Sequence, residues 1–378
     1  MTIITLIFIF LLVFYLLFLI RVNRGITKVI MDRINIKSDF VPTISVIIPF
    51  RNESEIILDS LASISKIDYP DDKLEIIYVD DNSEDDGYDK LRSANQSGKI
   101  KVIKTDRGDQ FAGQKKRAIL TGINNSTGEI IFTTDADCRH GNEWIRTMVS
   151  KFEENVGFVS GPVAYEDGET FFEKVQKMEF AGLVLVGAGL IGSKQPLLCN
   201  GANIAYRRDA FEKAGGFDDN IDISSGDDEF LMQKIAMGRK YSVKFCFENS
   251  ALVMTQNSRT VSEFVMQRRR WSSKGIFYKD KIKVAGLILI YLFYFSFPVM
   301  LALGISTDYF YLRLFWIAIL FKALFEYGVL KSGEILFRKK LNKGLFAAAQ
   351  FIQIPYIITI PLLGLLGNFT WKERKLKR

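Results

Sequence analysis

Histidine and cysteine are scarce in this 378-residue chain, which has one histidine and three cysteines. Cys138, Cys199 and Cys246 lie far apart, without the close spacing of zinc ligands, and the lone His140 cannot hold a metal by itself. The sequence therefore argues against a zinc site, and we expect His140 to be structural. It also argues against a disulfide framework, which agrees with a reducing compartment.

A soluble face on which basic residues alternate with aromatic ones is also missing from the sequence. The formal net charge of +7 gathers instead beside apolar segments, at residues 279–283, 338–340 and 372–378. Such clusters favour anionic lipid headgroups. We therefore expect a membrane as a partner of the chain, and we do not expect nucleic acid as one.

Long apolar runs, in contrast, are abundant. A spanning helix needs about 20 apolar residues, and four segments meet this requirement. They are residues 3–20, 284–305, 309–330 and 345–367. The third carries Arg313, Lys322 and Glu326, of which the last two are four residues apart and can pair within a helix. Residues 40–280 remain for one soluble domain, which is ample for a buried core.

The first apolar run does not have the pattern of a secretory signal. Its basic residues Arg21, Arg24 and Lys28 follow the apolar stretch instead of preceding it. By the positive-inside rule, this charge places the N-terminus outside and the soluble domain on the cytoplasmic side of the cell membrane. We therefore expect a multi-pass membrane protein.

The chain is thus expected to have four parts. They are an N-terminal transmembrane helix (1–22), a soluble domain (42–280), two or three C-terminal membrane helices (284–367) and a basic tail (368–378). Three C-terminal spans would place the basic tail outside, against the positive-inside rule. The last segment contains Pro355 and Pro361, so a re-entrant segment is one alternative, and an interfacial position for residues 309–330 is another.

Short β-rich runs alternate with helical stretches through the soluble domain. Strands are expected at residues 44–48, 74–79, 100–103 and 129–133, and helices at 54–64, 83–93 and 113–123. Pro49 is expected to stop the first strand. The alternation predicts an α/β domain with a mostly parallel central sheet, whose ligands bind beyond the carboxyl ends of the strands.

Two acidic pairs follow these strands. Asp80 and Asp81 come after the second, and Asp135 and Asp137 after the fourth, so the two pairs converge on one edge of the sheet. Mg²⁺ and Mn²⁺ prefer hard oxygen ligands, and Asp135 with Asp137 could hold such an ion, directly or through a bound diphosphate. Solvated turns and helix caps contain the same residues. The placement of both pairs after apolar strands favours a site in which Asp80 or Asp81 bonds the base or ribose of a nucleotide.

Two further clusters lie later in the soluble domain. Gly226-Asp227-Asp228-Glu229 opens an expected helix, where its acids could complement the helix dipole or supply a general base for an acceptor hydroxyl. The second cluster, Gln267-Arg268-Arg269-Arg270-Trp271, closes a helix shortly before an apolar run. Arginine suits diphosphate recognition and an indole offers a flat face for a sugar ring. An interfacial belt of arginine and tryptophan is the alternative.

One further motif is expected to be misleading. Gly187-Ala188-Gly189-Leu190-Ile191-Gly192 has the spacing of a dinucleotide-binding fingerprint, which would indicate a nicotinamide-dependent membrane reductase. That fingerprint needs a helix that continues beyond the third glycine, and residues 193–196 end with Pro196. We therefore expect residues 180–191 to form a buried or interfacial helix instead.

Together these residues make segment 42–275 resemble a family 2 glycosyltransferase with the GT-A fold. The resemblance rests on the four clusters above and on several shorter motifs. The shorter motifs are Ile47-Ile48-Pro49, Arg51-Asn52-Glu53, Asp68-Tyr69-Pro70, Gly201-Ala202-Asn203 and Gly215-Gly216-Phe217-Asp218. It implies an inverting transfer from a nucleotide-diphosphate sugar, of the UDP-sugar type, with Mg²⁺ or Mn²⁺ as cofactor.

The resemblance also implies a role for each site residue. The residues implied at the donor are Pro49, Arg51, Glu53, Asp80, Asp81, Lys115, Asp135 and Asp137. Of these, Asp135 and Asp137 would hold the metal ion. The family usually has Glu-Asp at the third motif, and Asp228 takes the position of the catalytic base if Asp227 replaces that glutamate. The residues implied at the diphosphate and acceptor are Gln267, Arg270 and Trp271.

The acceptor is expected to be a lipid. The Gln-x-x-Arg-Trp pattern is shared by processive polysaccharide synthases and by enzymes similar to ceramide glucosyltransferase. A synthase that secretes its polymer builds a channel, usually from more helices than this chain offers. A lipid hydroxyl at the cytoplasmic face is therefore favoured over a growing glycan chain. A non-catalytic membrane scaffold would be expected to lack a motif carboxylate, and none is missing.

Overall fold

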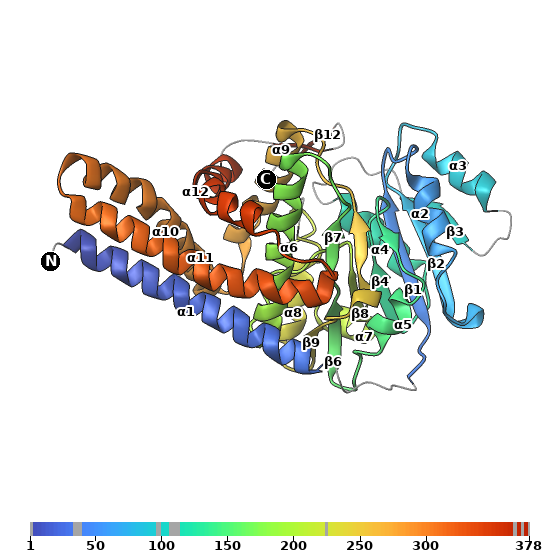
Figure 1. The fold of residues 1–378 in the computed structure, drawn as a ribbon. Helices are drawn as coiled ribbons and strands as arrows, with labels where there is room; N and C mark the ends of the chain where they lie inside the picture. The colour runs from blue at the N-terminus through green and yellow to red at the C-terminus, as the bar shows by residue number, and fades with distance from the viewer. Residues whose placement is uncertain are drawn as a thin grey trace.

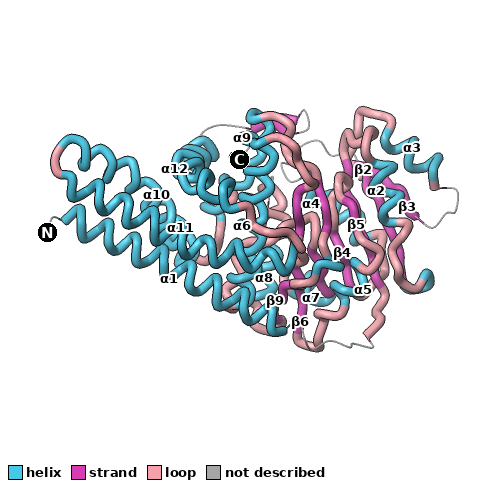
Figure 2. Tube along the Cα trace, in the orientation of Figure 1, coloured by secondary structure: helices cyan, strands magenta, loops and turns pink. Residues whose placement is uncertain are grey.

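A sheet domain and a group of long helices lie side by side in the computed structural model of the chain (Figure 1). The structure describes residues 3–32, 40–95, 100–105, 114–223, 226–365, 369–371 and 374–376. Strands occupy one half of the molecule, and long helices make up most of the other half (Figure 2). Of the predicted basic tail, only β11 (Phe369–Trp371) and β12 (Arg374–Leu376) are described, and they form an antiparallel pair.

The main sheet has seven strands in the order β3-β2-β1-β4-β8-β6-β9. Their bounds are β1 (Ile44–Phe50), β2 (Leu74–Asp80), β3 (Ile100–Lys104), β4 (Ile130–Thr133), β6 (Val156–Ser160), β8 (Ile204–Arg207) and β9 (Ser242–Phe245). The first four strands in this order are parallel, and β8 runs antiparallel to both of its neighbours. The prediction of an α/β domain with a mostly parallel sheet is confirmed.

The central strand β1 extends farther than the sequence predicted. All seven of its residues are buried, which agrees with a run of β-branched residues in the middle of a parallel sheet. The expectation that Pro49 stops this strand is wrong, because β1 runs to Phe50 and Pro49 pairs with Val79 of β2. The ladder with β4 already ends at Ile47, so no neighbour on that side needs an N–H from Pro49.

Helices cover the sheet and connect its strands. Those of the first half are α2 (Ile57–Ile64), α3 (Gly87–Ala94), α4 (Gln114–Asn124) and α5 (Trp144–Val149). Those of the second half are α7 (Arg208–Lys213), α8 (Glu229–Met237) and α9 (Val261–Ser273). Single 3₁₀ turns lie at Asp71–Lys73, Asn249–Ala251 and Gly275–Phe277. A small second sheet, in the order β5-β10-β7, joins β5 (Arg139–His140), β7 (Val163–Tyr165) and β10 (Val253–Thr255).

Five long helices complete the described part of the chain. They are α1 (Ile3–Asp32), α6 (Phe171–Gly192), α10 (Lys281–Ser306), α11 (Tyr309–Phe337) and α12 (Lys343–Leu365). Among the described residues, α1, α6, α10 and α12 are long and apolar enough to cross a membrane. The apolar stretch of α11 carries Arg313, Lys322 and Glu326, which keeps it outside this set, although α11 packs along α1 and α10 (Figure 1).

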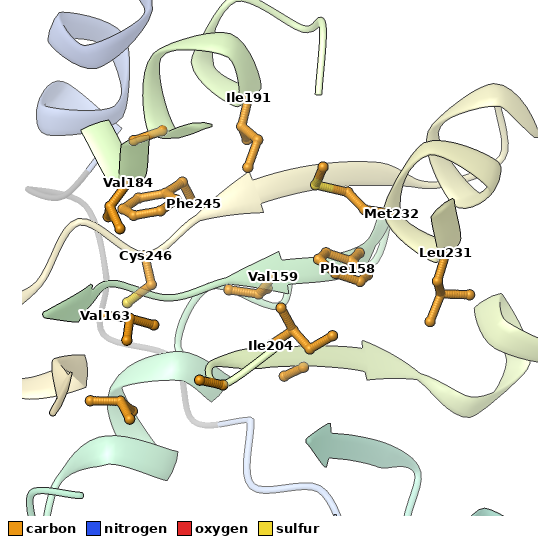
Figure 3. Close-up of a cluster of buried hydrophobic side chains, with 14 of the residues drawn as sticks. Phe158, Val159, Val163, Val184, Ile191, Ile204, Leu231, Met232, Phe245 and Cys246 are labelled. Atoms are coloured by element: carbon orange, nitrogen blue, oxygen red, sulfur yellow. The ribbon is translucent and has the colours of Figure 1, made fainter. Parts of the chain in front are cut away.

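Helix α6 connects the sheet to the long helices. More than half of its most apolar stretch is buried, against 22 to 33% in the other three apolar helices. Val184 and Ile191 lie over Phe245 of β9 in the core between α6 and the sheet (Figure 3). The helix therefore lies inside the protein, as the interpretation of residues 180–191 as a buried helix requires.

The glycines of α6 allow close approach to its neighbours. A Cβ on Gly189 would come within 2.5 Å of the Val22 carbonyl of α1, and one on Gly192 within 2.2 Å of the Gly25 carbonyl. A Cβ on Gly187 would meet the Leu198 carbonyl at 2.9 Å. The spacing that resembles a dinucleotide fingerprint therefore serves helix crossing, where small residues let backbones touch.

A cluster of ionic and phenolic side chains joins α1, α10 and α11. Lys322 donates to Glu326 at 3.0 Å, which confirms the predicted pairing within α11. Tyr15 of α1 and Tyr294 of α10 both donate to the same carboxylate. Because a charge within apolar surroundings is costly unless paired, this cluster fixes the relative positions of these helices.

Candidate active site

The carboxyl ends of β2 and β4 define one edge of the site. Both strands are parallel to β1, which lies between them, so the two acidic pairs that follow them converge as the sequence predicted. Asp81 follows β2 and is buried, while Asp135 and Asp137 follow β4 and are partly exposed. The sheet thus holds three carboxylates along one edge.

The two aspartates after β2 have different surroundings. Asp80 accepts a hydrogen bond from the Ser83 backbone N–H at 2.9 Å and so stabilises the turn after the strand. Arg51, which is buried, donates to the Asp81 carbonyl at 3.0 Å and to the Glu84 carboxylate at 2.7 Å. Arg51 and Asp80 therefore shape the loop, and Asp81 is the member of the pair that lines the cavity described below.

Lys115 of α4 joins two acidic motifs. Its Nζ lies 2.6 Å from Asp135 Oδ1 and 3.4 Å from Asp227 Oδ2. Burial opposes the charge of Lys115, but the two carboxylates outweigh it and raise the lysine pKa above its ordinary range. Burial likewise opposes ionisation of Asp227, and the cations of Lys115 and Lys116 outweigh it and lower the pKa of Asp227.

Asp228 is held from three sides at the start of α8. Its Oδ2 accepts from the Gly201 backbone N–H at 2.9 Å, and its Oδ1 accepts from the Glu229 N–H at 2.7 Å. Lys274 Nζ lies 3.6 Å from Oδ1. Gly226 ahead of it has a φ of +82°, a conformation that favours glycine, so the motif needs that residue to turn its two aspartates into the site.

A second buried carboxylate lies beside Asp228. Glu229 is 3.1 Å from Lys274 Nζ and accepts from the Tyr278 hydroxyl at 2.5 Å. Burial raises the pKa of Glu229 to about 7, with Lys274 acting in the opposite direction. Sequence reasoning missed Lys274 and Tyr278. The available signal was spacing, since Lys274 lies seven residues after Gln267, at the end of the same helix.

The side chains of α9 are held by contacts with α6 and β7. The side-chain oxygen Oε1 of Gln267 accepts from the Tyr165 hydroxyl at 3.2 Å and from Arg268 at 2.6 Å. Arg268, which the sequence interpretation passed over, is buried, pairs with Glu179 of α6 at 2.5 Å and stacks on the Trp271 ring at 4.2 Å. Gln267 and Trp271 are therefore presented in fixed orientations.

One cavity of about 1050 Å³ joins these groups. Nearly all of the predicted site residues line it: Pro49, Arg51, Glu53, Asp81, Lys115, Asp135, Asp137, Asp227, Asp228, Gln267, Arg270 and Trp271. Asp80 is not among the lining residues. The same cavity continues between the long helices, where it is lined from α1, α6, α10, α11 and α12.

The predicted metal-binding residues fit a hard divalent cation in part. Asp135 and Asp137 both face the cavity, and Asp137 Oδ2 accepts from the Thr255 hydroxyl at 3.1 Å. Within the described part of the chain, no group of three or more histidine, cysteine, aspartate or glutamate side chains is placed to hold a metal. Two carboxylates suit Mg²⁺ or Mn²⁺ because these ions keep several waters and take the remaining ligands from substrate phosphates.

His140 and the cysteines stand apart from this chemistry. The His140 ring is buried and bonds the Thr134 hydroxyl at 2.8 Å, and burial lowers its pKa to about 3. Cys138, Cys199 and Cys246 are free thiols. The buried ring agrees with the structural role expected for His140.

Comparison with known proteins identifies the fold. Residues 45–215 match the profile of glycosyl transferase family 2. A mannosyltransferase from Pyrobaculum calidifontis, solved with GDP-Man and Mn²⁺, is similar with a TM-score of 0.58 and 18% identity, over 96% of this chain and 99% of its own.

Among curated relatives, the probable glycosyltransferase YdaM of Bacillus subtilis is 27% identical over 73% of this chain and 67% of its own length. Poly-beta-1,6-N-acetyl-D-glucosamine synthase of Staphylococcus epidermidis is 24% identical over 62% of the chain and 55% of its own length. Beta-monoglucosyldiacylglycerol synthase of Trichormus variabilis is 26% identical, over 62% and 49% respectively. The chain thus spans about half the length of the last two relatives.

The fold is shared with a solved sugar transferase, and the GT-A fold predicted from the sequence is confirmed. The chain is a glycosyltransferase, and residues 45–215 form its family 2 glycosyltransferase domain.

Proposed function

We propose that the chain transfers a sugar, with inversion, from a nucleotide-diphosphate sugar to the hydroxyl of a membrane lipid at the cytoplasmic face. The observation that carries this proposal is the single cavity that runs from the acidic sheet edge into the space between α1, α6, α10 and α12. A site that is polar at one end and opens between apolar helices at the other suits a water-soluble donor and a lipid acceptor.

The donor would lie at the sheet edge. Asp81 and Glu53 face the cavity beside the end of β2, where a nucleoside would bond them. Lys115 and Arg270 supply cations for the diphosphate. When bound at Asp135 and Asp137, Mg²⁺ or Mn²⁺ would offset the charge that grows on the leaving diphosphate. The mannosyltransferase similar in fold was solved with such an ion, which supports a divalent metal.

Asp228 would act as the general base. Its carboxylate lines the cavity and is oriented by the Gly201 N–H and by Lys274. The base takes the proton of the acceptor hydroxyl, whose oxygen attacks the anomeric carbon from the face opposite the leaving diphosphate. A phosphate acceptor is already ionised at neutral pH and needs no such base, so the buried carboxylate favours an alcohol.

The inner half of the cavity is suited to hydrocarbon. Its lining there includes Leu19, Val186, Leu287, Ile290, Leu330 and Ile357. A polysaccharide would leave its hydroxyl groups without partners against such walls. This favours a lipid over the growing glycan chain that would make the protein a processive synthase.

The test is transfer by the purified protein. Labelled nucleotide sugars would be offered singly, with Mn²⁺ or Mg²⁺, together with diacylglycerol, ceramide or a polyprenyl phosphate. We expect a lipid carrying one sugar, and we expect Asp228→Asn to reduce transfer at least 100-fold while donor binding is retained. A long polymer formed without added lipid, or an Asp228→Asn variant with full transfer, would contradict the proposal.

The cytoplasmic orientation needs a separate measurement. Ser65 at the end of α2 is exposed, so a Ser65→Cys variant offers a thiol for an impermeant reagent. We expect labelling in inverted vesicles and protection in intact cells, and the reverse pattern would refute the assigned face.

A further inference from the structure

Three buried side chains, those of Tyr278, Glu229 and Lys274, form a row that ends at Asp228. The Tyr278 hydroxyl donates to Glu229 Oε2 at 2.5 Å, and Lys274 Nζ lies 3.1 Å from the same oxygen. Lys274 Nζ also lies 3.6 Å from Asp228 Oδ1. All three side chains of the row are buried and line the cavity. Burying such groups is costly unless they are paired, so the row and Asp228 are held in one arrangement.

The two carboxylate oxygens of Asp228 have different partners. Oδ1 accepts from the Glu229 backbone N–H at 2.7 Å and also faces the Lys274 ammonium group. Within the described part of the chain, Oδ2 accepts from one donor, the Gly201 backbone N–H at 2.9 Å. Each carboxylate oxygen has two lone pairs. The protein therefore occupies Oδ1 from two directions, and Oδ2 keeps a lone pair for a substrate.

The surroundings of Gly201 show which of these oxygens lies toward the donor. A Cβ built on Gly201 would lie 3.2 Å from Asp227 Oδ2 and 3.4 Å from Lys115 Nζ. Lys115 in turn contacts Asp135, which is proposed to bind the metal and the diphosphate. The Asp228 oxygen that bonds the Gly201 N–H is Oδ2. This oxygen therefore lies beside the groups proposed to hold the donor, where an attacking hydroxyl has to be deprotonated.

We propose that the row positions the general base, so that Asp228 takes the acceptor proton on Oδ2 and not on Oδ1. Lys274 holds Oδ1, and Glu229 and Tyr278 hold Lys274, which makes all three positioning residues. In this step the acceptor O–H bond breaks and its proton bonds to Oδ2. The freed electron pair forms the bond to the anomeric carbon, whose bond to the diphosphate oxygen breaks. The inference rests on the proposed function and deepens its proton-transfer step.

Lys274 itself is unsuited to take the proton. Burial opposes its charge, but the neighbouring Asp228 and Glu229 outweigh burial and raise the pKa of Lys274 above its ordinary range. An ammonium group has three donors and no acceptor, so Lys274 can orient a carboxylate but cannot act as a base. At the other end of the row, Tyr278 lies two residues before Asp280, the N-cap of α10. The row thus ties the base to the start of α10.

The experiment measures whether Lys274 acts through Asp228. It uses the full-length protein, dioleoylglycerol and the nucleotide sugar that gives the fastest transfer. We expect Lys274→Met to lower kcat about 10- to 100-fold while KM for the nucleotide sugar changes less than about 2-fold, because a misplaced base slows proton removal and not donor binding. Added to Asp228→Asn, the same change should lower kcat less than about 2-fold, because no base is left to position.

Tyr278→Phe tests the far end of the row with a smaller change. It removes one hydroxyl and keeps the ring that packs on Phe230. We expect kcat to fall about 3- to 10-fold, the worth of one hydrogen bond to a charged group, and to fall no further when Asp228→Asn is also present. Because this variant keeps the packing, it decides the inference if Lys274→Met does not fold. Thermal unfolding and nucleotide diphosphate binding report folding in each variant.

Lys234→Met is the matched control. Lys234 lies on α8, the helix that begins with Glu229, and pairs with Asp219 at 2.6 Å. It is not among the residues that line the cavity. Removing this ion pair should leave kcat within about 2-fold of the wild type.

Three results would overturn the inference. They are wild-type kcat in both Lys274→Met and Tyr278→Phe, an equal fall when either change is added to Asp228→Asn, and a fall of the same size in Lys234→Met. Full transfer by Asp228→Asn would refute the assigned base, and the inference with it. A wild type that forms a polymer refutes the lipid acceptor alone, because the same variants then decide the inference by the rate of polymer synthesis.

Discussion

Arg268 of α9 and Glu179 of α6 form a buried ion pair, with Arg268 Nη2 2.5 Å from Glu179 Oε2. Tyr356 of α12 donates to the other oxygen of the same carboxylate at 2.9 Å. The pair thus joins the helix that presents Gln267 and Trp271 to two helices of the long group. In the sequence, Arg268 occupies the first unspecified position of the Gln-x-x-Arg-Trp pattern. Its contribution is to hold α9 in place, which the pattern alone does not predict.

Removing one member of this pair should be more harmful than removing both charges. Arg268→Met leaves a carboxylate buried without a cation, and we expect a loss of about 3 kcal/mol in unfolding free energy. The double variant Arg268→Met with Glu179→Gln should recover more than half of that loss. Denaturant unfolding of the detergent-solubilised protein measures both values.

The exposed pair of Lys213 and Asp209 on α7 provides the control for this cycle, since Lys213→Met should cost less than about 1 kcal/mol. Strictly additive effects of the two changes at Arg268 and Glu179 would show that the pair is not coupled.

Two glycines of α6 should respond differently to alanine, because only one of them lies at the crossing with α1. Alanine at Gly182 meets only the Leu330 side chain at an ordinary 3.6 Å, so Gly182→Ala should leave stability unchanged or raise it by about 0.5 kcal/mol. Alanine at Gly189 would come within 2.5 Å of the Val22 carbonyl, so Gly189→Ala should lower stability by about 2 kcal/mol. Thermal unfolding of the two variants measures the difference, and equal midpoints would mean that α1 and α6 cross less closely.

The strand pattern and the glycines at residues 187–192 show how much of the structure the sequence could predict. Alternating strands and helices predicted the parallel part of the sheet, and placed Asp81, Asp135 and Asp137 at one edge, because chain direction in a parallel sheet determines where strands end. The prediction that β1 ends at Pro49 was wrong, because the sequence does not show that the ladder with β4 ends two residues earlier. Whether glycines of a given spacing hold a phosphate or a neighbouring helix depends on packing.

Contacts between distant segments account for the remaining part of the site. Lys115 lies between Asp135 and Asp227, which are 92 residues apart in sequence, and no local pattern predicts that meeting. Lys274 and Tyr278 reach Glu229 for the same reason. Motifs identified the carboxylates, and tertiary packing determined which cations neutralise them.

Lys115 also predicts how the site responds to metal. Lys115→Met leaves Asp135 and Asp227 without their shared cation. We therefore expect the free energy of unfolding to fall by about 2 kcal/mol in metal-free buffer. A divalent ion should then stabilise this variant more than the wild type, because it neutralises the same carboxylates. Thermal unfolding with and without Mn²⁺ measures the difference.

Lys101→Met is the matched control, since Lys101 pairs with Glu75 at the exposed start of β2 and β3. It should respond to Mn²⁺ as the wild type does. An equal gain in the Lys115 variant and the wild type would argue against a metal at Asp135.

Stability should fall as pH decreases because of His140. Burial depresses its pKa from 6.5 to about 3, so the unfolded chain binds a proton in that window and the folded chain does not. The contribution of His140 to the free energy of unfolding is fully present above pH 6.5. Below that pH it decreases by about 1.4 kcal/mol per pH unit. Denaturant unfolding between pH 5 and 8 should show the wild type gaining stability relative to His140→Gln as pH rises to 6.5, and parallel curves would contradict a buried neutral ring.

Glu229 should contribute a pH dependence of the opposite sign. Burial raises its pKa from 4.5 to about 7, so this carboxyl keeps its proton in the folded protein while the unfolded chain releases it. Its contribution is complete below pH 4.5 and is lost as pH rises to about 7. Relative to Glu229→Gln, the wild type should therefore lose stability between pH 5 and 7, whereas relative to His140→Gln it gains stability from pH 5 to 6.5. Because the two slopes oppose each other, the wild-type curve alone can look flat, and only the two difference curves test the groups separately. A Glu229→Gln difference curve without slope would mean that Lys274 keeps this carboxylate ionised.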